Sequence, residues 1–256
     1  MIKGVLLDIG GVVYVGETAL AGAVEAVARL KHAGLPVRCV TNTTRTPVAG
    51  IVARLKRLGL EVEADDVFTP ARAARAYLEA LDLKPHLLIH RALEPDLTGL
   101  DGAGGEAVIV GDAGDGFSYA AMNAAFRKLM AGADFIALAA NRMFMDDDNV
   151  LSIDCGAFVA ALEYAVGREA LVLGKPAPDF FIAAAESMGC TIDEAVMIGD
   201  DAEADIAGAL TAGVAQAILV RTGKYLDGDE IRFDPRPTAT VSDLSDAADW
   251  VLDNRS

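Results

Sequence analysis

The stretch Ile-Lys-Gly-Val-Leu-Leu-Asp-Ile-Gly-Gly, residues 2–11, begins with an apolar run that ends at a single carboxylate. The run Ile2–Leu7 predicts a buried strand, and Gly10 and Gly11 after Asp8 predict a tight turn. Ligands of an open parallel α/β sheet bind beyond the carboxyl ends of its strands, where Asp8 would lie. An aspartate before glycines is more often only a turn residue, so the rest of the chain must decide between the two interpretations.

Polar residues follow apolar runs in the same way at three further places: Val40-Thr41-Asn42, Gly174-Lys175-Pro176 and Ile198-Gly199-Asp200-Asp201, with Asp205 shortly after the last. Parallel strands end along one edge of their sheet, so these stretches are expected to meet Asp8 there. Thr41 and Asn42 offer a hydroxyl and an amide to phosphate oxygens, although such residues more often cap the next helix. Lys175 can neutralise an anionic group, although a lone lysine in a turn is usually solvated surface.

The acidic group near residue 200 is the strongest of these signals. It comprises Asp200, Asp201, Glu203 and Asp205, and the apolar run 196–198 before it places Asp200 at the sheet edge. Carboxylates gathered in this way repel one another unless a hard cation or solvent lies between them. A helix that begins with acidic residues, which its dipole favours, is the alternative interpretation.

Short apolar runs alternate with helical periods along the chain, which predicts β–α units around a parallel sheet. In the first part we expect helices at 21–33 and 46–58, a strand at 37–40, and a helix with Thr69 as N-cap and Pro70 as its first residue. A second α/β layer is expected in the middle, with strands at 86–90, 107–111 and 135–139 and helices at 118–130 and 156–166. The first pattern then returns, with apolar runs at 170–173, 195–198 and 217–220 and helices at 178–188 and 202–212. The fold class is therefore α/β, with a core domain over 1–81 and 171–256 and an inserted domain over 82–170.

Composition restricts the partners and the compartment. The chain has 256 residues and a formal net charge of −16, which argues against a nucleic-acid or anionic-membrane partner. The three cysteines are scattered and lack zinc or disulfide spacing, as expected in a reducing cytoplasm. We see neither a signal peptide nor a membrane span, so a soluble cytoplasmic protein is expected. The three histidines lack metal-ligand spacing, and the acidic run 146–148 is expected to be a solvated turn.

In this order along the chain, the four stretches resemble the motifs of the haloacid dehalogenase superfamily, most of whose members are magnesium-dependent phosphatases with an aspartate nucleophile. The resemblance implies a Rossmann-like parallel-sheet core with an inserted α/β cap of the C2 type, as in the class IIA branch. Segments 41–47, 140–142 and 158–164 look nearest to the phospholysine phosphohistidine inorganic pyrophosphate phosphatase subgroup, within the branch that includes nitrophenylphosphatase-like enzymes. A homodimer through the cap is expected by family analogy.

The resemblance also implies a role for each site residue. Asp8 would attack phosphorus and form an aspartyl-phosphate, with Thr41 and Lys175 as the other catalytic residues. Asp8, Asp200 and the carbonyl of Gly10 would hold Mg²⁺, and Asp205 would orient the metal's waters or Lys175, with Asp201 as the second candidate for that role. The phosphorylated substrate would contact Gly10, Thr41, Asn42 and Lys175. Asn141 and Arg142, in a loop after a strand of the insert, are the best candidates for further contacts with it, although Arg142 could equally be a surface residue.

Gly10 departs from the family pattern, because most phosphatases of the superfamily have an aspartate there that protonates the leaving group. Loss of a general acid costs about 10²- to 10⁴-fold in rate when the leaving group is poor. We therefore expect a small substrate with a good leaving group: pyrophosphate, a phosphoramidate or an aryl phosphate. Glu17 could partly substitute for the acid, although the sequence favours its interpretation as a solvated loop residue.

Two other functions remain open on the same fold. Without the acid, the chain could be a binding or regulatory protein that captures phosphate or a phosphorylated ligand without turnover. Dehalogenation is the weaker alternative, because Asp200 together with Asp205 implies a cation that dehalogenases do not use.

Overall fold

The computed structural model describes residues 1–145 and 150–255, so the acidic run 146–148 lies outside the described residues. The chain divides into two compact units. The core unit comprises Met1–Thr41, Val48–Phe68 and Lys175–Ser256, and the insert unit comprises Asn42–Pro47 and Thr69–Gly174. The boundaries predicted from the sequence, with an inserted domain over 82–170, stay a prediction.

A six-stranded parallel sheet forms the centre of the core unit, in the order β14-β13-β12-β1-β4-β5. Its strands are β1 (Gly4–Asp8), β4 (Val37–Val40), β5 (Val67–Phe68), β12 (Ala195–Gly199), β13 (Gln216–Val220) and β14 (Ala239–Val241). Every residue of β1, β4 and β12 is buried, as is typical of parallel strands covered on both faces. Asp8 therefore ends an inner strand of the sheet.

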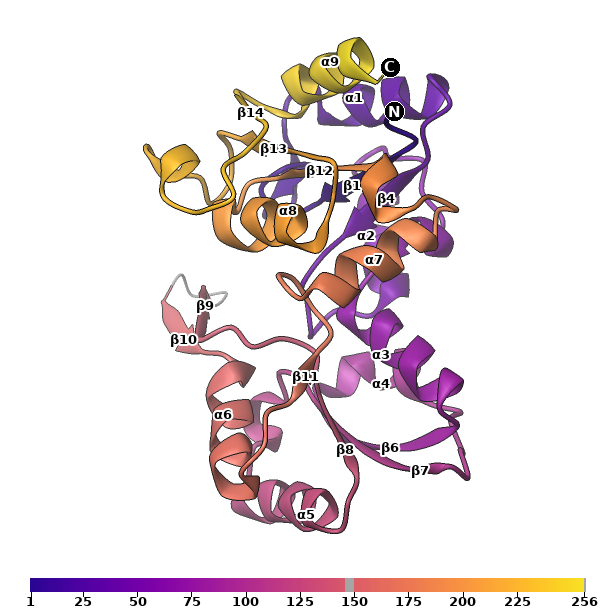
Figure 1. Ribbon diagram of the computed structural model, residues 1–256, viewed down its shortest axis with the longest axis vertical. Helices are drawn as coiled ribbons and strands as arrows, with labels where there is room; N and C mark the ends of the chain where they lie inside the picture. Colours follow the sequence, from indigo (N-terminus) through magenta and orange to yellow (C-terminus); the bar gives the residue numbers. More distant parts are fainter. Residues whose placement is uncertain (146–149, 256) are drawn as a thin grey trace. The chain divides into compact units, whose positions relative to one another are not determined.

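Helices cover both faces of this sheet (Figure 1). The core unit contains α1 (Ala23–His32), α2 (Val48–Arg57), α7 (Pro178–Glu186), α8 (Gly208–Ala212) and α9 (Leu244–Asn254), with short 3-10 helices at Ala64–Asp66, Ile192–Glu194 and Asp229–Ile231. Buried residues of α1, α2 and α9 share one hydrophobic cluster with alternate residues of the strands. The helix expected at 202–212 is a π-helix over Ala202–Ala207 that continues into α8. A hairpin of β2 (Tyr14–Val15) and β3 (Thr18–Ala19) follows the turn after β1.

The insert unit has a four-stranded parallel sheet of its own, in the order β11-β8-β7-β6. Its elements are α3 (Pro70–Ala80), β6 (Leu83–Leu88), α4 (Glu94–Leu97), β7 (Gly105–Val110), α5 (Tyr119–Met130), β8 (Asp134–Ala137), α6 (Cys155–Val166) and β11 (Leu171–Val172), a hairpin of β9 (Met143–Met145) and β10 (Leu151–Ile153), and 3-10 helices at Arg91–Leu93 and Gly114–Gly116. Buried residues of α5 and α6 pack against β7 and β8. The prediction of α/β architecture, a parallel-sheet core with an inserted α/β part, is confirmed.

Two local predictions have clear outcomes. Thr69 is the N-cap of α3, with its hydroxyl accepting a hydrogen bond from the Arg72 amide over 3.1 Å, and Pro70 is the first helical residue as predicted. The run 170–173 was expected to resume the core pattern, but its strand β11 pairs with β8 of the insert unit. A strand of two residues carries no sequence pattern that identifies its partner. In the described part of the chain, no helix is long and apolar enough to cross a membrane.

Candidate functional site

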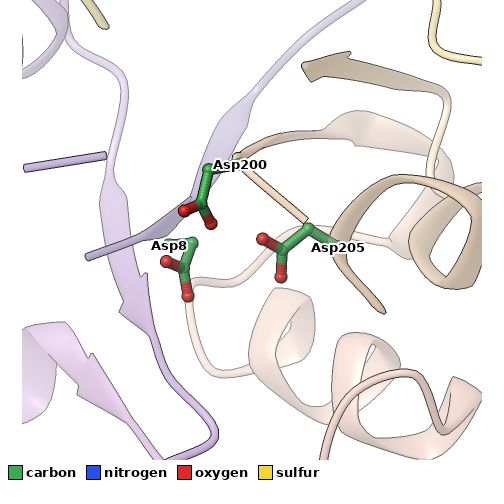
Figure 2. A group of neighbouring side chains, drawn as sticks. All are labelled: Asp8, Asp200 and Asp205. Carbon is green, nitrogen blue, oxygen red and sulfur yellow. The ribbon is translucent and has the colours of Figure 1, made fainter. Parts of the chain in front are cut away.

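Three buried carboxylates meet at the carboxyl edge of the core sheet: Asp8, Asp200 and Asp205 (Figure 2). Asp8 ends β1 and Asp200 directly follows β12, which is hydrogen-bonded to β1, so the parallel register brings the two side chains to neighbouring strand ends. Asp205 comes from the π-helix that follows. One oxygen of each side chain lies within 4.8 Å of those of the other two. Their exposed fractions are 7%, 2% and 1%, so water compensates little of their charge.

Lys175 joins two of these carboxylates. Its Nζ lies 2.5 Å from Asp8 Oδ1 and 2.6 Å from Asp205 Oδ1, and only 4% of its side chain is exposed. Burial acts to lower the pKa of Lys175, but the adjacent Asp205 and Asp8 outweigh it and raise that pKa above its ordinary value. The lysine is therefore a fixed positive charge beside Asp8.

The carboxylates carry more negative charge than one ammonium balances. Burial raises the pKa of Asp8 to about 7. The positive charge of Lys175 acts to lower this pKa, and the negative charges of Asp205 and Asp200 act to raise it further. Burial, followed by repulsion from Asp205, raises the pKa of Asp200 to about 6. Buried carboxylate oxygens that lack a full set of cations are hard ligands of the kind Mg²⁺ takes, so the donor set fits that metal.

The structure distinguishes the two candidates for the residue that orients the metal's waters or Lys175, Asp205 and Asp201. The carboxylate of Asp201 caps the π-helix, accepting from the amides of Ala204 over 2.9 Å and Glu203 over 3.2 Å. Asp205 instead bonds Lys175, and its Oδ2 accepts from the Asp201 amide over 3.2 Å. The geometry thus favours Asp205 as the residue that orients Lys175.

The position of Gly10 has room for a side chain. Gly10 is exposed and forms a bridge with Tyr14 at the start of the β2–β3 hairpin. A Cβ built on Gly10 would meet no atom within 4 Å among the residues that the structure describes, and its backbone is outside the left-handed region. A lack of space therefore does not explain why position 10 has a glycine and not the aspartate of the family pattern.

Glu17 is unsuited to replace the missing acid. It forms an ion pair with Arg54 of α2 and lies 3.8 Å from Arg57. The hydrogen bond from Arg54 lowers the pKa of Glu17, so its carboxylate holds no proton at neutral pH.

The remaining predicted residues divide between the two units. Thr41 belongs to the core unit and directly follows β4, whose last residue, Val40, pairs with Asp8. Asn42 belongs to the insert unit, as do the exposed residues Asn141 and Arg142 just before β9. The structure thus gathers Asp8, Lys175, Asp200 and Asp205, with Thr41 at the neighbouring strand end.

Sequence reasoning missed one loop at this edge, at residues 222–224 after β13. The amide of Lys224 donates to Asp200 Oδ2 over 2.7 Å, and the hydroxyl of Thr222 donates to the carbonyl oxygen of Gly11 over 2.6 Å. The signal was present, because the loop follows the predicted apolar run 217–220 as the other site stretches follow theirs.

Comparisons with known proteins identify the family of the chain. A family model described as Haloacid dehalogenase-like hydrolase matches residues 5–102, and a HAD-hydrolase-like model matches residues 172–247. The chain is 41% identical to the phospholysine phosphohistidine inorganic pyrophosphate phosphatase of Bos taurus, covering 98% of this chain and 94% of the relative. It is 39% identical to haloacid dehalogenase-like hydrolase domain-containing protein 2 of Homo sapiens, covering 98% of this chain and 96% of that protein.

Solved structures show the same fold. The p-nitrophenyl phosphatase from Archaeoglobus fulgidus superposes with a TM-score of 0.87 at 26% identity, covering 97% of this chain and 99% of that chain. NagD from E. coli K-12 superposes with a TM-score of 0.83 at 27% identity, covering 95% of this chain and 97% of that chain. The matching family models and the relatives that are covered over nearly their whole length show that the chain belongs to the haloacid dehalogenase-like hydrolase family.

Proposed function

We propose that this chain is a Mg²⁺-dependent phosphatase that acts on a small phosphorylated molecule, with Asp8 as the nucleophile. The observation that carries the proposal is the buried group of Asp8, Asp200 and Asp205 around the ammonium of Lys175. The names of two relatives, a pyrophosphate phosphatase and a p-nitrophenyl phosphatase, support the same reaction class.

Asp8 supplies the attacking oxygen. Lys175 holds Oδ1, which leaves the other carboxylate oxygen to attack phosphorus as the bond to the leaving group breaks. The product of this step is an aspartyl-phosphate on Asp8. A water molecule then attacks the phosphorus, which releases inorganic phosphate and restores the carboxylate. The positive charge of Lys175 also favours the ionised form of Asp8 that this attack requires.

The other roles follow from position. Asp8, Asp200 and the carbonyl of Gly10 would hold Mg²⁺, which when bound offsets the charge of the phosphoryl oxygens. Asp205 holds Lys175 in place from outside the ligand set. We assign the phosphoryl oxygens to Thr41, Asn42 and Lys175, and the rest of the substrate to Asn141 and Arg142.

Gly10 narrows the range of substrates. It provides no proton for the leaving group, and the nearby Glu17 is bound by Arg54. Phosphoryl compounds whose leaving group departs without a proton from the enzyme should therefore react faster than alkyl phosphates. Pyrophosphate, a protonated phosphoramidate and an aryl phosphate meet this condition, whereas a sugar phosphate does not.

Phosphate release from these four substrates tests the proposal, with and without Mg²⁺, in the natural chain and in Asp8→Asn. We expect Mg²⁺-dependent turnover of the first three, slower turnover of the sugar phosphate, and a loss of about 10³-fold or more in Asp8→Asn. A chain that binds Mg²⁺ and phosphate but turns over none of the four would favour the phospho-ligand binding protein instead.

The proposal also includes a homodimer formed through the insert unit, a cytoplasmic location, and the absence of nucleic-acid and membrane partners. The net charge of −16 supports the last of these, because anionic surfaces repel both partners. Light scattering of the purified chain would test the dimer, and a salt-dependent DNA-binding assay would test the exclusion of nucleic acid.

A further inference from the structure

The loop of Thr222, Gly223 and Lys224 lies against the residues proposed to hold Mg²⁺. It follows β13, which pairs with β12, the strand that ends just before Asp200. The proposed roles leave this loop without a function. Its contacts reach two segments that carry the candidate ligands.

Hydrogen bonds tie the loop to both segments. The hydroxyl of Thr222 donates to the carbonyl oxygen of Gly11, next to the proposed ligand Gly10, over 2.6 Å. The amide of Lys224 donates to Asp200 Oδ2 over 2.7 Å. Thr222 and Gly11 are 211 residues apart in the sequence, so this bond joins segments from near the two ends of the chain.

Two glycines enclose the carboxylate of Asp200. A Cβ on Gly11 would lie 2.0 Å from Asp200 Oδ2, and a Cβ on Gly223 would lie 1.9 Å from the same oxygen. Both glycines have positive φ, 81° at Gly11 and 60° at Gly223. Close packing on two sides, together with the Lys224 amide, leaves Asp200 one orientation. With Oδ2 engaged in this way, the other carboxylate oxygen is left for a cation.

We propose that Thr222 is a positioning residue for the Mg²⁺ site, because its hydroxyl holds the turn after Asp8 and the loop that orients Asp200 in one arrangement. The inference rests on the proposed function, since it presupposes Mg²⁺ at Asp8 and Asp200. Groups that orient metal ligands from outside the ligand set typically change metal affinity by about 10- to 100-fold. Loss of the Thr222 hydroxyl should change the affinity for Mg²⁺ by a factor in this range.

Calorimetric titration of the metal-free full chain with Mg²⁺ tests this role. Thr222→Val keeps the shape of the side chain but removes the donor, and we expect it to weaken Mg²⁺ binding by about tenfold. Thr222→Ser keeps the donor and should retain most of the affinity. Thr240→Val, on β14 outside the loop, is the matched control for replacing a hydroxyl by a methyl group and should bind Mg²⁺ like the natural chain.

Thermal unfolding of each metal-free variant separates a structural role from a positioning role. A Thr222→Val protein that melts earlier but binds Mg²⁺ with unchanged affinity would overturn the inference. Gly223→Ala provides a second approach, because its methyl group would displace the Asp200 carboxylate, and it should weaken Mg²⁺ binding by at least about tenfold. Unchanged affinity there would contradict the proposal as well. If the natural chain bound no Mg²⁺ at all, the proposed function itself would fail.

Discussion

Both units bury aspartates, but they compensate the charge in different ways. In the insert unit, Asp154 caps α6 by accepting from the Cys155 amide over 2.6 Å. Asp112 pairs with Arg45 over 2.5 Å and accepts from the Gly114 amide over 3.0 Å. Each acid there has partners of its own.

The core unit instead gathers three buried carboxylates around one lysine. Burial raises the pKa of Asp8 to about 7 and that of Asp200 to about 6, which shows that the folded chain alone compensates these charges poorly. The difference teaches that burial alone does not identify a functional acid. A buried acid with its own partners stabilises the fold, whereas a group that shares too few cations is suited to bind one.

The largest effect should come from removing a ligand of the core group. Asp200→Asn should weaken Mg²⁺ binding by more than about 10²-fold, beyond the loss expected for residues outside the ligand set. Calorimetric titration measures the dissociation constant. Asp154→Asn is the matched control, because it changes a buried acid of the insert unit, and it should bind Mg²⁺ like the natural chain. An equal loss of Mg²⁺ affinity in the two variants would contradict the distinction drawn between the buried acids of the two units.

Adding a carboxylate to the core group should widen the range of substrates. Gly10→Asp has room for its side chain, and it should raise the rate on a sugar phosphate by about 10²-fold, the lower end of the gain typical of a general acid. The rate on an aryl phosphate should change much less. Steady-state kinetics on both substrates measures this selectivity. An equal gain on both would contradict the argument from leaving groups.

The metal-free chain should lose stability as pH rises. Ordinary ion-paired carboxylates have the opposite effect, because they stabilise the folded state as they ionise. The pKa of Asp200 is about 6 in the folded chain against 3.8 for its ordinary value, so the folded state binds more protons between these values. The free energy of unfolding should therefore fall as pH rises from about 4 to 7, by about 2 kcal/mol for this group.

Urea unfolding at a series of pH values, with and without Mg²⁺, measures this dependence. Mg²⁺ should restore stability at pH values above the pKa of Asp200 and have little effect below it, where protons compete for the carboxylates. In Asp200→Asn the fall with pH should become shallower. A metal-free stability that rises over the same range would argue against the raised pKa values.

The smallest effect should appear in the insert unit. Asp154→Ala removes a helix cap and should lower the free energy of unfolding by about 1 kcal/mol, without changing Mg²⁺ affinity. Urea unfolding and calorimetric titration provide the two readouts. A clear loss of Mg²⁺ affinity here would mean that the insert unit takes part in metal binding.

The sequence predicted the core strands well because parallel strands buried on both faces are continuous apolar runs. The runs that end near Asp8, Val40 and Ile198 are the strands β1, β4 and β12, and their polar successors meet at one sheet edge. The parallel α/β fold could be predicted for the same reason, whereas the family was predicted from the resemblance of the four motifs in their order along the chain.

Contacts between distant segments were beyond sequence reasoning. The bond of Thr222 to Gly11 spans 211 residues, so no local spacing indicates it, and a role for Asp205 beside Lys175, 30 residues away, was expected only from the family resemblance. The strands β2, β3 and β11 have two residues each, too few to show a period or to indicate a pairing partner. Their positions depend on packing that only the folded chain reveals.

Trapping the reaction on Asp8 tests the central claim most directly. The Mg²⁺-loaded chain would be mixed with p-nitrophenyl phosphate, quenched in acid within one turnover and digested for mass spectrometry. We predict that the peptide containing Asp8 gains the mass of one phosphoryl group, and that Asp8→Asn shows neither this gain nor turnover. Turnover that persists in Asp8→Asn, with no phosphoryl group on the peptide of the natural chain, would contradict the account.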